Sequence, residues 1–151
     1  MAALTREEVV AGTVVQLDAD GLRASGHSKT NAEKTQNEDR AVAGNHSFLI
    51  LKVDSAAGVA SLVPIFSGCA PGSEQLQENL KSGYRARWFG VDLFFNKWQH
   101  WETPIEQIVH HSTVEDTPAG NRRTYATTDT TELEWILEFS TKNRAPWRDL
   151  S

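Results

Sequence analysis

The chain has 151 residues, of which 39% are hydrophobic, and its net charge is −5 with histidine neutral. This length and this apolar content are typical of one globular domain and exclude disorder of the whole chain. The single cysteine, Cys69, excludes an internal disulfide and a zinc site built from paired cysteines. The longest apolar runs, such as Phe48–Leu51, are far shorter than the ~20 residues that span a bilayer. The N-terminal residues lack the pattern of a signal peptide. We therefore expect a single cytoplasmic domain over residues 1–151, with no membrane partner.

Two short elements are predicted near the N-terminus. Thr5 and Glu8 have the spacing of a capping box, in which each side chain satisfies a backbone donor of the other residue. This pattern predicts a single helical turn at about residues 5–10. The short β-branched run at residues 13–17 predicts a strand.

A long polar stretch follows, at about residues 18–47. Apart from alanines, its interior has only Leu22 and Val42 as apolar residues. So little apolar surface offsets only a small part of the entropy that ordering the segment costs. We expect residues 19–45 to be mostly exposed, without a long regular element, and to cover a site, because loops of this length are usually functional or mobile.

The middle of the chain predicts a β-hairpin. Residues 47–53 are nearly all apolar, which is typical of a strand buried on both faces, and residues 59–66 form a second apolar run. Turn-forming residues at 54–58 separate the two runs, so we expect an antiparallel pair at the centre of the fold.

Further strands and one helix are predicted after the hairpin. Alternation over residues 84–89 favours a strand, and a second strand is expected at residues 91–99. The pattern Thr103-Pro104-Ile105-Glu106 is typical of a capping box with proline at the first helical position, and it predicts a helix over residues 104–111.

The last third leaves two alternatives open. Residues 131–140 have alternation that favours a strand, but a helix would also give them one broad apolar face. Short strands with few helices predict a mainly β fold with short helices (α+β), arranged as a small β-barrel.

The residues that could carry chemistry are few. Ser67 and Cys69 are potential nucleophiles, and His46 is a potential base for either of them. Adjacent His110 and His111 point to different sides of a helix and make a poor chelate. We expect neither a metal site nor a cofactor.

Residues 81–101 combine aromatic and basic side chains. They hold seven of the 13 aromatic residues, and four basic residues with one acidic residue give this segment a net charge of +3. Aromatic rings beside cations are typical of proteins that bind single-stranded nucleic acid. The ligand-binding residues predicted here are Arg85, Arg87, Trp98, His100 and Trp101. The alternative is that the rings belong to the core and the arginines to a solvated strand face.

Part of the chain resembles the MazF/PemK-type toxins. The resemblance lies in Gly12-Thr13-Val14-Val15, in the apolar run at residues 48–51, and in the Pro64-Ile65-Phe66-Ser67 ending of the next run. It implies an SH3-like or related barrel that cleaves RNA and forms a homodimer, with Ser67 at the hydroxyl position of the family. The family places an arginine just before the first of these strands, where this chain has Asn45-His46-Ser47. Cleavage needs a cation near the phosphate, so His46 or Arg40 is expected to replace that arginine.

Two functions from different classes remain open. The first is a toxin-like barrel that binds or cleaves single-stranded RNA, an endoribonuclease-like enzyme if it is one, with His46, Ser67 and Arg40 as its catalytic residues. The second is a non-catalytic interaction module that binds a protein or a small ligand through the aromatic surface at residues 98–101. A small-molecule enzyme that uses His46 and Cys69 is a third, minor alternative.

Overall fold

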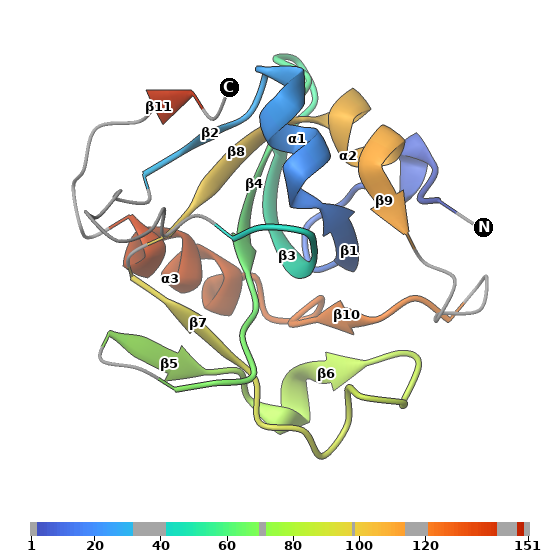
Figure 1. Ribbon diagram of the computed structural model, residues 1–151. Helices are drawn as coiled ribbons and strands as arrows, with labels where there is room; N and C mark the ends of the chain where they lie inside the picture. Colours follow the sequence, from blue (N-terminus) through green and yellow to red (C-terminus); the bar gives the residue numbers. More distant parts are fainter. Residues whose placement is uncertain are drawn as a thin grey trace.

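The computed structural model describes residues 3–31, 42–69, 72–97, 99–113, 121–141 and 148–149 (Figure 1). Its helical elements are η1 (Arg6–Glu8), α1 (Ala19–Ser25), η2 (Glu78–Leu80), α2 (Ile105–His111) and α3 (Thr130–Ser140). Its strands are β1 (Val14–Asp18), β2 (Lys29–Thr30), β3 (Asn45–Asp54), β4 (Val59–Pro64), β5 (Ser73–Gln75), β6 (Lys81–Ser82), β7 (Phe94–Asn96), β8 (Trp101–Pro104), β9 (Ser112–Thr113), β10 (Thr124–Tyr125) and β11 (Arg148–Asp149).

The central element is an antiparallel sheet of seven strands in the order β11-β2-β8-β4-β3-β1-β9. Strands β3 and β4 pair at its centre, with Leu49 opposite Val63, which confirms the predicted hairpin. The smaller pairs β10-β6 and β5-β7 lie outside this sheet. The protein is thus mainly β with short helices. The strand order has two free ends, so no closed barrel is formed by the residues that the structure describes.

Strand β3 separates two hydrophobic cores. Phe48 and Ile50 belong to the first core, whereas Leu49 and Leu51 belong to the second. Because neighbouring residues of a strand point to opposite faces, this run is buried on both sides, as its apolar sequence predicts. Helices α1 and α2 cover the first core and α3 packs against the second (Figure 1).

The polar stretch after β1 contains more structure than we expected. The Asp18 carboxylate accepts a hydrogen bond from the Gly21 N–H (3.1 Å) and caps α1, and Gly26 ends this helix in a left-handed conformation. Leu22 is fully buried in the first core. Among the described residues of this stretch, the prediction of a mostly exposed loop is therefore wrong, because one cap and one buried leucine suffice to order a short helix. Residues 32–41 lie outside the described residues.

Residues 130–140 form the helix α3, which decides between the two alternatives that the sequence left open. A strand would have placed Ile136 on the polar face, whereas the helix buries it together with Leu133 against the second core. The predicted helix α2 is confirmed, and Ile105 and Ile108 face inward. Its predicted capping box is wrong, because Thr103 lies in β8 and its buried hydroxyl has no partner among the described residues. None of the helices described is long and apolar enough to cross a membrane.

His100 is part of the buried framework, which contradicts its predicted place on an aromatic surface. Its ring Nδ1 lies 2.7 Å from the Ser140 hydroxyl at the end of α3, and its backbone N–H donates to the Asn31 side-chain oxygen (2.7 Å). The Asn31 amide group in turn donates to the Ser140 carbonyl (3.1 Å). Burial lowers the pKa of His100 to about 4, because the charged ring would lose its hydration.

Stability is therefore expected to fall in mild acid through His100. Above pH 6.5 the His100 ring is neutral in both the folded and the unfolded state. Between pH 6.5 and about pH 4 the ring is protonated in the unfolded chain but stays neutral in the folded chain, so the unfolded state is favoured. The difference in unfolding free energy between the wild type and His100→Gln should shrink by about 3 kcal/mol from pH 7 to pH 4. Urea unfolding at both pH values measures it. A difference that does not change with pH would contradict the buried neutral ring.

Candidate functional site

A cavity of about 560 Å³ opens beside the start of β3. Its wall is built by β1, the start of β3, the segment that follows β4, and the loop at residues 83–91. The residues that line it are Val14, Val15, Gln16, Asn45, His46, Ser47, Ile65, Phe66, Ser67, Gly68, Cys69, Arg87, Trp88, Leu93, Thr113 and Arg123. Three residues predicted from separate stretches of the sequence, His46, Ser67 and Arg87, thus line one cavity.

His46 and Ser67 reach the cavity from neighbouring parts of the hairpin. His46 lies in β3, and its ring packs edge-on against the rings of Phe66 (5.1 Å between centroids) and Phe48 (5.9 Å). Beyond the end of β4, Ile65 still donates its N–H to the Ser47 carbonyl (2.9 Å). This bond keeps the segment that carries Ser67 beside the start of β3.

The surroundings of His46 favour its neutral form. Burial lowers the pKa of His46 below the ordinary 6.5, and a hydrogen bond with the backbone of Ile65 acts in the opposite direction. A bond that favours the charged ring is one in which the ring donates. The ring Nε2 is itself buried and has no hydrogen-bond partner among the described residues. At neutral pH the ring is therefore neutral and can accept a proton.

Arg87 comes from a loop, whereas the sequence predicted a strand at residues 84–89. Residues 86–90 form turns, and the N–H of Trp88 and that of Phe89 both donate to the Arg85 carbonyl (3.1 Å each). The predicted strand at residues 84–89 is therefore wrong, and Arg85 and Arg87 do not project from one strand face. Arg87 lines the cavity, and the guanidinium of Arg85 lies over the Phe89 ring (5.0 Å to the centroid) and outside the cavity wall.

Gly83 explains why the alternating pattern does not form a strand. Its backbone has φ = 95°, a conformation that residues other than glycine rarely adopt. A Cβ at this position would lie 2.1 Å from the Arg122 carbonyl oxygen. The chain turns at this point and passes close to residues 121–123, where the Tyr84 N–H donates to the Asn121 carbonyl (3.1 Å).

Arg123 is a cavity residue that the sequence analysis missed. Its guanidinium donates to the Tyr84 carbonyl (3.3 Å) and to the Ala86 carbonyl, and it lies over the Tyr84 ring (5.4 Å). The signal was the adjacent pair Arg122-Arg123 close to Tyr125. Arg122 itself is engaged elsewhere, because its Nε donates to the Glu8 carboxylate (2.7 Å).

The cavity has the opposite charge to the whole protein. Arg87 and Arg123 contribute two positive charges, and none of the described residues in its wall is Asp or Glu. The chain as a whole carries −5. Because a concave wall concentrates the field of the charges that line it, this cavity is suited to an anionic ligand.

The other predicted site residues do not join this group. Trp101 is fully buried, packs edge-on against Phe48 (5.3 Å), and donates its indole N–H to the Gln99 side chain (2.7 Å). Trp101 and His100 therefore do not lie on an exposed aromatic surface. Arg40 and Trp98 lie outside the described residues.

Comparison of the chain with protein-family models, with curated proteins and with solved structures gives no match. The resemblance to the MazF/PemK-type toxins therefore depends on the residues of this chain alone, and it stays a prediction.

The protonation of His46 can be measured directly. The ring proton resonances, assigned by comparison with His46→Gln, should titrate in NMR spectra with a midpoint below pH 6.5, because burial disfavours the charged ring. A midpoint at or above pH 6.5 would show that the charged ring is stabilised by a partner or by water, which contradicts the burial described here.

Proposed function

We propose that the protein binds single-stranded RNA at this cavity and cleaves it there. The observation that carries the proposal is that His46, Ser67 and Arg87 line one cavity whose described wall has no carboxylate. A proton acceptor, a hydroxyl group and a cation are the groups that cleavage of a phosphodiester requires.

The cavity fits a phosphate and the nucleotide that carries it. Guanidinium groups such as those of Arg87 and Arg123 bind phosphate through charged hydrogen bonds. The volume of about 560 Å³ lies within the range of small-molecule sites, roughly 300–1,000 Å³. A nucleotide can enter such a concave site only when it is unstacked, which favours a single strand over a duplex.

The protonation of His46 suits a general base. The neutral ring of His46 takes the proton of the ribose 2′-hydroxyl, the 2′-oxygen attacks the phosphorus, and the bond from phosphorus to the 5′-oxygen breaks. The leaving 5′-oxygen takes a proton from solvent, so the products are a 2′,3′-cyclic phosphate and a 5′-hydroxyl. The arginines and the Ser67 hydroxyl stabilise the charge on the phosphoryl oxygens.

The resemblance to MazF/PemK-type toxins supports the same substrate, because that family cleaves RNA and its hydroxyl position corresponds to Ser67. The finer features that it implies, an SH3-like barrel and a homodimer, belong to this proposal as expectations. The alternative of an interaction module has less support, since Trp101 and His100 of its aromatic surface are buried.

Binding is tested with Arg87→Ala and a single-stranded 2′-O-methyl oligonucleotide, which lacks the 2′-nucleophile and is not cleaved. Affinity should fall about tenfold or more, since a charged hydrogen bond contributes about 1.5–3 kcal/mol. The slope of log affinity against log salt should become shallower by about one. Fluorescence anisotropy measures both, and Lys52→Ala, which removes an exposed lysine outside this cavity, should change affinity little. A wild type without affinity at low salt would refute the proposal.

Cleavage is tested with His46→Gln on the unmodified oligoribonucleotide. Loss of the general base should slow cleavage about 10²- to 10⁴-fold and leave affinity for the 2′-O-methyl analogue nearly unchanged. The wild-type rate should rise with pH and level off above a midpoint below pH 6.5, because the base works only when neutral. A variant that cleaves as fast as the wild type would exclude His46 as the base.

A further inference from the structure

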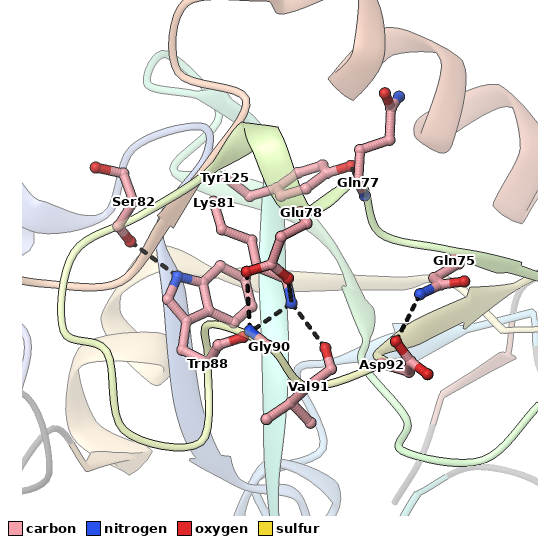
Figure 2. Close-up of polar contacts among 10 residues, drawn as sticks. All are labelled: Gln75, Gln77, Glu78, Lys81, Ser82, Trp88, Gly90, Val91, Asp92 and Tyr125. Atoms are coloured by element: carbon pink, nitrogen blue, oxygen red, sulfur yellow. Dashed lines mark hydrogen bonds and ion pairs between the residues drawn. The ribbon is translucent and has the colours of Figure 1, made fainter.

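Lys81 is a buried lysine that does not line the cavity. Only 1% of its side chain is exposed, and its ammonium group has three hydrogen-bond partners. Nζ donates to the Glu78 carboxylate (2.8 Å), to the Trp88 carbonyl (2.8 Å) and to the Val91 carbonyl (2.7 Å) (Figure 2). All three ammonium donors are therefore used, which is what a buried cation requires.

These bonds hold the end of the loop at residues 83–91 close to the residues that precede it. The other Glu78 carboxylate oxygen accepts from the Gly90 N–H (2.8 Å), and the Trp88 indole N–H donates to the Ser82 carbonyl (2.9 Å) (Figure 2). The Lys81 ammonium also lies 5.1 Å from the centre of the Trp88 ring. The Lys81 ammonium group thus satisfies backbone carbonyls that strand pairing would otherwise satisfy, because this loop pairs with no strand.

Arg87 lies within this tied segment. It directly precedes Trp88, whose carbonyl Lys81 binds, and its backbone has φ = 56°. Residues other than glycine hold such a conformation only where the surrounding contacts impose it. Release of the Trp88 carbonyl would let Arg87 return to an ordinary backbone conformation and leave the cavity wall.

We propose that Lys81 is a positioning residue of the RNA site, which holds the Arg87 guanidinium at the cavity without contacting the ligand. This inference rests on the proposed function. It also requires that the contribution of Lys81 to RNA binding depends on Arg87.

A double-mutant cycle tests that dependence. The variants are Lys81→Met, Arg87→Ala and the double variant, with the single-stranded 2′-O-methyl oligonucleotide as probe. Lys81→Met should weaken binding about as much as Arg87→Ala, roughly tenfold, and should have almost no further effect when Arg87 is already absent. Equal losses with and without Arg87, or no loss, would overturn the inference. Lys52→Met removes an exposed lysine and should leave affinity nearly unchanged, which excludes a general effect of charge.

Hydrogen exchange separates local from global effects. In Lys81→Met the Trp88 indole N–H and the Gly90 amide should exchange faster, while the amides of β3 keep their wild-type protection. Unchanged exchange at Trp88 and Gly90 would overturn the inference.

If Lys81→Met unfolds the whole chain, Glu78→Gln replaces Lys81→Met in the cycle. The Glu78→Gln variant keeps both bonds from Lys81 to the loop carbonyls and should show a smaller loss of affinity that also requires Arg87. A loss independent of Arg87 would again overturn the inference. A wild type that binds no RNA refutes the proposed function instead, and the exchange measurement still decides whether Lys81 orders the loop.

Discussion

Burial of β3 on both faces is the constraint on which the rest of the structure depends. Phe48 and Ile50 enter one core and Leu49 and Leu51 the other, so a shift of register by one residue would exchange every side chain between two differently shaped cores. Strands β1 and β4 are aligned by their pairing with β3. The cavity opens where the strand emerges from these cores, and His46 is consequently held by a strand whose register both cores fix.

The opposite wall of the cavity is held in a different way. The loop at residues 83–91 has no strand pairing, and two cations bind its carbonyl oxygens instead. Arg123 binds those of Tyr84 and Ala86, and Lys81 binds those of Trp88 and Val91. The positive residues around position 85 therefore have different roles: Lys81 holds the loop, and Arg87 is presented by the loop at the cavity. This division reconciles an acidic protein with a basic cavity.

Local sequence patterns predicted those parts of the fold in which the alternation of apolar and turn-forming residues alone determines the structure. The hairpin followed from two apolar runs and a turn, and His46 and Ser67 were recognisable as a potential base and a potential nucleophile. The loop at residues 84–89 was mispredicted because its alternation mimics a strand, whereas the chain turns at Gly83 and its backbone passes close to Arg122, an approach that the sequence does not reveal. His100 and Trp101 were placed at the surface because their buried partners, Ser140 and Gln99, cannot be identified as partners from sequence spacing.

The most direct test of the cavity as the RNA site uses Cys69, the single cysteine of the chain, which is exposed and lines the cavity. The rate of its alkylation by iodoacetamide can be measured by mass spectrometry with and without a saturating single-stranded 2′-O-methyl oligonucleotide. Bound RNA should slow alkylation of the wild type, and the same concentration should give Arg87→Ala little protection. An alkylation rate that stays unchanged while the oligonucleotide is bound would show that RNA, if it binds, binds elsewhere.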